Sequence, residues 1–242
     1  MRVGLFVTCL VDMMRPRIGF AALRLLESAG YEVVVPVRQT CCGQPGYNSG
    51  DRAAAQVLAR KVLEEFRDCD YVVTPSGSCG GMIKDHYADA LREFPELSRD
   101  VALLAERTFE LTDFLVNVAK IDRLPGDFAG TVTYHDSCSG LRELGVKQQP
   151  RALLAKLPRV VLKELTTPEQ CCGFGGTFAI KYGDISARIA DQKCDDVTAT
   201  GADAVVLGDL GCMLNIEGRL RRRGDQRTKV LHIAEVLAGM TE

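Results

Sequence analysis

The chain has 242 residues, of which 46% are hydrophobic and 26% are charged, and its net charge is −2 at pH 7. This globular composition excludes a disordered or fibrous protein, and the small net charge gives no reason to expect nucleic acid or an anionic membrane as a partner. The unusual features are 10 cysteines and 23 glycines.

The first residues resemble a short signal sequence but are better explained as a strand. The apolar run 3–11 is followed at once by Asp12, Arg15 and Arg17, without a small-residue cleavage site. No apolar run approaches the roughly 18 residues that a transmembrane helix needs. We therefore expect a cytoplasmic protein with no transmembrane segment, in which thiols are metal ligands or redox groups rather than disulfides.

Strands and helices are predicted to alternate through the first half. Apolar, β-rich runs predict strands over 3–8, 31–37 and 71–74. Helical periodicity predicts helices over 17–29, 51–68, 82–94 and 111–119.

The second half repeats this order. Strands are predicted over 131–135, 160–162 and 204–207, and helices over 151–157, 184–198 and 213–222. Strand–helix alternation is typical of βαβ units, so we expect an α/β fold with parallel sheets in two pseudo-symmetric halves that arose by internal duplication. Pro125 and Gly126 form a linker, which divides the chain into a first repeat at 1–124 and a second at 125–242.

Eight of the ten cysteines repeat in the same order, at offsets of about 130 residues. The two sets are Cys9, Cys41, Cys42 and Cys79 in the first half, and Cys138, Cys171, Cys172 and Cys212 in the second. Each cysteine follows a predicted strand, and parallel strands end at one edge of a sheet, so the thiols of each set are expected to converge there. Neighbouring helix N-termini favour an anionic cluster. Cys69 and Cys194 have no counterparts and are predicted to be buried, inert thiols.

The cysteine pattern resembles a known family. It is Cys-x31-Cys-Cys-Gly-x35-Cys followed by Cys-x32-Cys-Cys-Gly-x38-Cys, which looks like the duplicated cysteine-rich CCG domain. That domain occurs in a cysteine-rich component of heterodisulfide reductase, in the iron–sulfur subunit of glycolate oxidase and in the lactate utilisation protein A branch. Segments 134–145, 171–176 and 232–235 are similar to the lactate utilisation branch.

The resemblance implies one iron–sulfur cluster per repeat, held by these eight cysteines. It also implies electron transfer in a complex that oxidises L-lactate to pyruvate, with sister subunits of which one carries ferredoxin-type clusters. We expect an oxidoreductase subunit rather than a complete enzyme, and the sequence indicates no catalytic residue. The heterodisulfide reductase relative uses a fifth cysteine, but Met82 and Asn215 stand at those positions here. Four thiolates per repeat suit an ordinary [4Fe–4S] cluster.

Several alternatives stay open at this point. The chain could be an enzyme that cleaves disulfides, although the missing fifth cysteines argue against it. It could be a zinc-stabilised binding module, and aerobically isolated protein could hold zinc, although no Cys-x-x-Cys knuckle is present. Glycolate or another 2-hydroxy acid could replace lactate. Among the histidines, His135 is predicted to support a cluster sulfur or the fold, with a role as ligand or proton relay as the alternative. His86 and His232 are predicted to be packed or surface residues.

Overall fold

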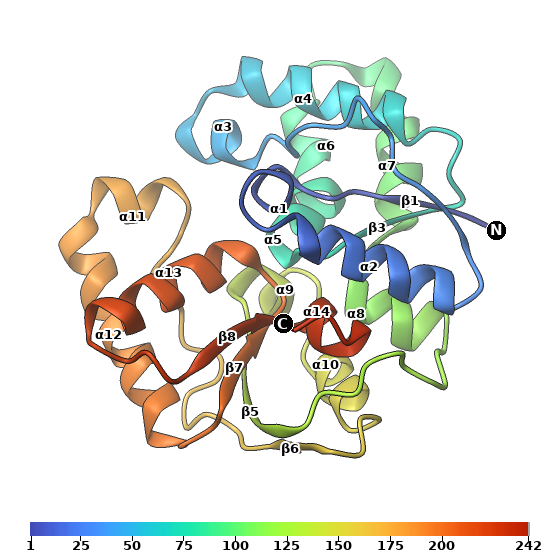
Figure 1. Ribbon diagram of the computed structural model, residues 1–242. Helices are drawn as coiled ribbons and strands as arrows, with labels where there is room; N and C mark the ends of the chain where they lie inside the picture. The colour runs from blue at the N-terminus through green and yellow to red at the C-terminus, as the bar shows by residue number, and fades with distance from the viewer. Residues whose placement is uncertain (242) are drawn as a thin grey trace.

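The computed structural model describes residues 1–241, and these fold into two four-stranded parallel sheets with helices around them (Figure 1). The first sheet has the order β2-β1-β3-β4, with β1 at Arg2–Leu5, β2 at Glu32–Val34, β3 at Tyr71–Thr74 and β4 at Thr108–Glu110. The second has the order β6-β5-β7-β8, with β5 at Gly130–His135, β6 at Val160–Leu162, β7 at Ala204–Leu207 and β8 at Lys229–His232. The predicted α/β fold with two similar halves is confirmed.

Helices connect the strands of each sheet. Those of the first half are α1 (Cys9–Met14), α2 (Pro16–Ser28), α3 (Gln44–Ser49), α4 (Arg52–Glu65), α5 (Gly77–Gly81), the π-helix η1 (Met82–His86), α6 (Tyr87–Ala90), the 3₁₀-helix η2 (Pro95–Leu97), α7 (Ser98–Glu106), α8 (Leu111–Asp113) and the π-helix η3 (Phe114–Val118). Those of the second half are α9 (Cys138–Arg142), α10 (Gln148–Leu154), α11 (Thr177–Lys181), α12 (Gly183–Ala199), α13 (Leu210–Arg222) and α14 (Ile233–Ala238). None of the helices within residues 1–241 has both the length and the apolar character to cross a membrane.

The strand register shows which residues of the two halves correspond. Leu5 of β1 pairs with Val73 of β3, and Tyr134 of β5 pairs with Val206 of β7. The next position is Phe6 in the first half and His135 in the second, and Phe6 continues the pairing by donating its N–H to the Val73 carbonyl at 2.8 Å. The duplication seen in the cysteines therefore extends to the backbone pairing.

Two strands, β4 and β8, were not predicted from the sequence. Each pairs with one neighbour, and the short segments Thr-Phe-Glu of β4 and Lys-Val-Leu-His of β8 contain charged residues, so no apolar run marks them. His232, predicted to be a packed or surface residue, ends β8 and caps α14, where its Nδ1 accepts from the Ala234 N–H at 3.2 Å. Its expected packing is confirmed, since the side chain is buried.

The two halves pack together by exchanging equivalent contacts. Helix α14, which follows the fourth strand of the second sheet, packs against α2 of the first half, and α8, which follows the fourth strand of the first sheet, packs against α10 of the second. An ion pair between Arg17 Nε and Glu235 Oε1 at 2.9 Å joins α2 to α14. The larger hydrophobic core contains residues of both halves, from Val3 to Ala238. This exchange is the arrangement expected for two repeats related by a pseudo-twofold axis.

Residues 119–129 connect the sheets and run along α14. The Gly126 N–H donates to the Leu237 carbonyl at 2.8 Å. A Cβ at position 126 would lie 2.4 Å from the Val236 carbonyl oxygen, so only glycine fits this close approach.

Candidate metal centres

The four repeated cysteines of the first half meet at the carboxyl edge of the first sheet. Cys9 begins α1 after β1, Cys41 and Cys42 lie in the loop before α3, and Cys79 lies in the first turn of α5 after β3. The Cys41 thiol contacts those of Cys9 and Cys42, and the Cys42 thiol also contacts that of Cys79. We call these four residues the first tetrad.

The second half repeats this arrangement at its own sheet. Cys138 begins α9 after β5, Cys171 and Cys172 lie in a loop after β6, and Cys212 lies in the first turn of α13 after β7. The Cys171 thiol contacts those of Cys138 and Cys172, and the Cys172 thiol contacts that of Cys212. These four residues are the second tetrad.

The two remaining cysteines take no part in either tetrad. Cys69 follows α4 and lies beside Gly4, while Cys194 lies within α12 and is fully buried. Both are free thiols, and burial raises the pKa of each. The prediction that they are buried is confirmed.

A left-handed glycine shapes each Cys-Cys-Gly turn. Gly43 has a φ of 88° and Gly173 a φ of 87°, values that side chains other than glycine rarely adopt. In both turns the glycine N–H donates to the first cysteine, to Cys41 Sγ at 3.4 Å and to Cys171 Sγ at 3.3 Å. The turn therefore fixes the direction of the first thiol in each pair.

Two thiols of the first tetrad, those of Cys9 and Cys79, lie at helix N-termini. Ser76 caps α5 and its Oγ accepts from the Cys79 N–H at 3.3 Å. Thr8 caps α1 and its Oγ1 accepts from the Val11 N–H at 3.3 Å, although its φ of 76° is unusual for a β-branched residue. Strained backbone conformations of this kind are typical of functional sites, and Thr8 directly precedes Cys9.

Asn215 and Met82, which stand at the family's fifth cysteine position, have structural contacts of their own. Asn215 Nδ2 donates to the Cys172 carbonyl at 2.8 Å and so holds the loop of the second tetrad. In the first half the Tyr87 hydroxyl makes the corresponding bond to the Cys42 carbonyl at 2.9 Å. Met82 is fully buried in the core beside Cys42 and Cys79. Each centre therefore has four thiols from the repeated pattern.

The thiols of each tetrad polarise one another. Hydrogen bonds from the Cys42 and Cys9 thiols lower the pKa of Cys41 to about 3, and those from Cys138 and Cys172 lower the pKa of Cys171 to about 2. The same bonds raise the pKa of the donating thiols. Thiols bind metals as thiolates, so a bound cation would displace the protons that these thiols share.

A cavity of about 300 Å³ opens over the first tetrad. The second half supplies one wall of it, through residues that include Phe174, Thr177, Ile180 and Asp209. Asp209 also ties the halves together, because its Oδ2 accepts from Ser76 Oγ at 3.1 Å and from the Ser78 N–H at 3.0 Å. The first centre is thus enclosed by both repeats.

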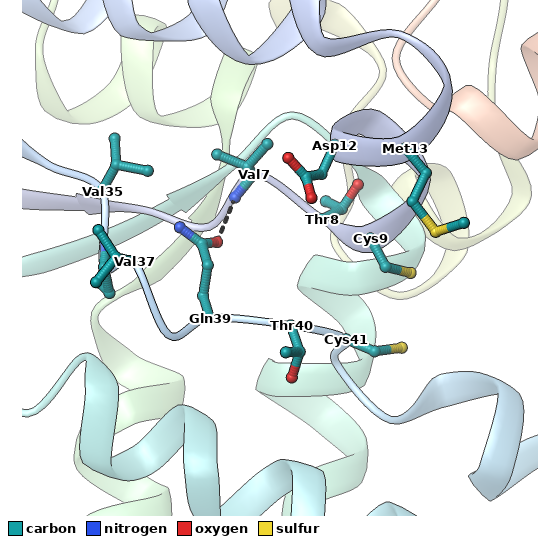
Figure 2. Close-up of a pocket in the computed structure, with 11 residues that line it drawn as sticks. Val7, Thr8, Cys9, Asp12, Met13, Val35, Val37, Gln39, Thr40 and Cys41 are labelled. Atoms are coloured by element: carbon teal, nitrogen blue, oxygen red, sulfur yellow. Dashed lines mark hydrogen bonds between the residues drawn. The ribbon is translucent and has the colours of Figure 1, made fainter.

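A second cavity, of about 380 Å³, lies on the other side of Cys9 and Cys41 (Figure 2). Gln39 anchors its floor to the end of β1, donating to the Leu5 carbonyl at 3.1 Å and accepting from the Val7 N–H at 2.8 Å. Figure 2 shows the Cys9 and Cys41 sulfur atoms pointing the same way, from α1 and from the loop after Gln39.

His135 joins the second tetrad. One ring nitrogen of His135, Cys172 Sγ and Cys212 Sγ lie within 4.8 Å of one another, and all three residues are buried. Neither ring nitrogen has a hydrogen-bond partner among residues 1–241. Complete burial and the nearby Lys193 ammonium lower the pKa of the imidazole to about 3, so the ring is neutral at physiological pH.

Lys193 is the residue near a centre that sequence reasoning missed. It lies on α12, is fully buried, and its Nζ donates to the Thr167 carbonyl at 2.5 Å. No motif surrounds it, and a lysine on a helical pattern is usually exposed. The one sequence feature that indicates its burial is its place on the same helix face as Ala190 and Val197, which are also buried.

Other predicted polar residues stay away from the thiols. His86 is partly exposed, with its Nε2 3.7 Å from Glu143 Oε1. The basic run 219–223 at the end of α13 is paired within the chain: Arg219 binds Asp191 at 2.5 Å and Arg223 binds Asp195.

Comparison with known proteins places this geometry in a family. The cysteine-rich CCG domain matches residues 3–84 and again residues 132–217. Lactate utilization protein A of Bacillus cytotoxicus is 44% identical over 237 residues, covering 98% of each chain. The protein of that name from Geobacillus thermodenitrificans is 45% identical over 237 residues, with the same coverage.

A solved structure shares the fold. A hypothetical protein from Helicobacter pylori superposes with a TM-score of 0.69 at 12% identity, over 100% of this chain and 49% of that one. The duplicated match and the identity along nearly the whole length agree with the two tetrads, and the chain belongs to the cysteine-rich CCG domain family, in the branch of the lactate utilization A proteins.

Proposed function

We propose that this chain is an iron–sulfur electron-transfer subunit of a complex that oxidises L-lactate to pyruvate. The observation that carries the proposal is the pair of thiol tetrads, each gathered from three loops at the carboxyl edge of its sheet. The lactate part is supported by the name of relatives that match 98% of the chain.

In this proposal each tetrad holds one [4Fe–4S] cluster. Cys9, Cys41, Cys42 and Cys79 would bind one, and Cys138, Cys171, Cys172 and Cys212 the other. When bound, such clusters accept and release single electrons. The chain's own residues supply the thiolates, the glycine turns that aim them, and an enclosure that both repeats build around the first centre.

Sister subunits complete the proposed complex. One of them carries ferredoxin-type clusters and passes electrons to or from this chain, which we place in the cytoplasm, where thiols stay reduced. The chain is then an oxidoreductase subunit rather than a complete enzyme. The boundary between the repeats is proposed at residues 124 and 125.

A zinc-stabilised module is the second candidate, and one observation favours it. The nitrogen of His135 and the sulfurs of Cys172 and Cys212 are close enough together for a single tetrahedral ion. A disulfide-cleaving enzyme has no such support, because Met82 and Asn215 occupy the fifth-cysteine positions.

Metal content tests the cluster part. We expect about eight irons and eight sulfides per chain after anaerobic purification, and about half of each in Cys42→Ser and in Cys172→Ser. Cys69→Ser and Cys194→Ser are the matched controls and should keep the full content. Stoichiometric zinc without iron, even after anaerobic reconstitution, would replace the cluster proposal by the zinc module.

Growth tests the substrate. A strain carrying the double variant Cys42→Ser/Cys172→Ser as its sole copy should fail on L-lactate and grow normally on glycolate. Loss of growth on glycolate alone would reassign the substrate, and normal growth on both would remove the 2-hydroxy-acid role.

A further inference from the structure

The two centres have different surroundings at one matched position. Phe6 and His135 occupy equivalent places, one residue beyond the paired positions Leu5 and Tyr134. Phe6 is buried and its ring packs on Phe66, with ring centroids 5.7 Å apart. The first centre therefore has an apolar ring where the second has an imidazole.

No hydrogen bond of ordinary geometry within the described residues accounts for the burial of His135, although the Pro168 backbone lies beside its ring. Its side chain has no exposed surface, and both ring nitrogens lack a hydrogen-bond partner among the described residues. Leaving a buried polar group unpaired destabilises the folded chain. A phenylalanine fills the equivalent place in the first half, so packing alone does not require a histidine.

The geometry places the unpaired nitrogen beside two thiols of the second tetrad. The nitrogen and the sulfurs of Cys172 and Cys212 lie within 4.8 Å of one another. Donors on one tetrahedral metal, with bonds of about 2.0–2.3 Å, lie about 3.3–3.8 Å apart, so a side-chain movement of about 1 Å would bring the imidazole nitrogen within bonding distance of a metal held by these thiols.

We propose that His135 is a nitrogen donor to the metal centre of the second tetrad, and that the first centre is held by sulfur alone. The inference rests on the proposed metal-binding function and adds a ligand that the repeated cysteine pattern does not contain.

A second difference between the repeats is a buried lysine near the second tetrad. Gly43 faces Leu58 on α4, and Gly173 faces Ile189 on α12, so Leu58 and Ile189 occupy corresponding positions on these two helices. This alignment puts Lys193 of the second repeat at the place of Val62 in the first, and both side chains are buried. The Lys193 cation favours thiolates at Cys171 and Cys172 and does not compete as a ligand while it is protonated.

Nitrogen spectroscopy on the unmodified chain tests the assignment. The full chain is labelled with ¹⁵N-histidine, reconstituted anaerobically with iron and sulfide, reduced, and examined by pulsed EPR. We expect a histidine nitrogen coupling of the size found for direct metal ligation. It should persist in Cys41→Ser/Cys42→Ser, which disables the first tetrad, and disappear in Cys171→Ser/Cys172→Ser.

Two matched variants identify the histidine. The chain has 3 histidines, so His135→Phe, which copies the first repeat, should abolish the coupling, and His86→Gln should retain it. Titration with Co²⁺ alone, in the Cys41→Ser/Cys42→Ser background, should show at least tenfold weaker binding after His135→Phe, on the scale of lost supporting contacts at metal sites.

The outcomes separate this inference from the function on which it rests. Normal iron content without a histidine coupling in the unmodified chain would overturn the His135 assignment and leave the cluster proposal standing. The assignment also fails if His135→Phe keeps the coupling. A chain that binds neither iron nor Co²⁺ in either repeat would overturn both.

Discussion

At the scale of single residues, Glu110 at the end of β4 is a buried carboxyl group with a raised pKa. It is almost fully buried and caps α8, where its Oε2 accepts from the Thr112 N–H at 2.7 Å and the Thr112 hydroxyl at 2.5 Å. Burial nevertheless raises the pKa of its carboxyl to about 7, because the charged form loses its hydration.

This shift makes stability depend on pH in a defined direction. Between the ordinary pKa of 4.5 and about 7 the folded chain binds a proton at Glu110 that the unfolded chain has lost. The free energy of unfolding therefore falls as pH rises through this window, by about 3 kcal/mol from this group. Glu110→Gln should flatten that fall, measured by urea denaturation of the metal-free chain at pH 5 and pH 8.

The surface residue Glu27 of α2 provides the control. It is exposed, so Glu27→Gln should leave the difference between pH 5 and pH 8 unchanged. If Glu110→Gln behaved the same way, Glu110 would be ionised in the folded chain and solvated by water between the repeats.

At the scale of elements, the contact between α5 and α9 joins the helices that carry Cys79 and Cys138. The backbones meet at two glycines: a Cβ on Gly77 would lie 2.7 Å from both Cα and N of Gly140. No side chain fits there without moving one helix. The spacing between the two tetrads therefore depends on this glycine contact.

Gly77→Ala should disrupt the contact. We expect a loss of about 2–3 kcal/mol in the free energy of unfolding, as for overpacking of a tight interface. Gly218→Ala is the matched control, because position 218 lies within α13 with nothing inside 4 Å of an added Cβ, and should stabilise by about 0.5–1 kcal/mol. Equal effects of the two substitutions would show that the helices can separate freely.

The sequence predicted the features with a strong local signal and missed those without one. The central strands and the eight cysteines stand out because hydrophobic runs and spacing repeat along the chain. β4 and β8 contain charged residues and lack an apolar run, and Lys193 has no motif. The wall that Phe174 and Ile180 build over the first tetrad is a contact between repeats, which no local pattern encodes.

At the scale of the whole molecule, the repeats share the larger of two hydrophobic cores. Residues from both sheets belong to it, and α14 covers α2 across the boundary, whereas a smaller core around Phe66 lies within the first repeat. The apolar face of α2 is buried only when both repeats are present, so the repeats stabilise one another.

We therefore expect the metal-free chain to unfold in one cooperative transition, with calorimetric and van't Hoff enthalpies in agreement. A fragment of residues 1–124 should lack a cooperative transition and bind a hydrophobic dye, since Ile18, Leu25 and their neighbours on α2 lose their cover. A fragment that melts sharply would instead show two independent domains.

The position of α14 in the sequence also determines when the apolar face of α2 can be covered during synthesis. It comprises six buried residues, Ile233–Ala238, close to the end of the chain, and it is the main packing partner of α2 near the beginning. The apolar face of α2 therefore stays uncovered on a growing chain until residues 233–238 have been synthesised. We expect the part of the first repeat that packs on α14 to stay unfolded until then, which prolongs the exposure of the first tetrad and extends the time in which a chaperone or a metal-delivery protein can reach it.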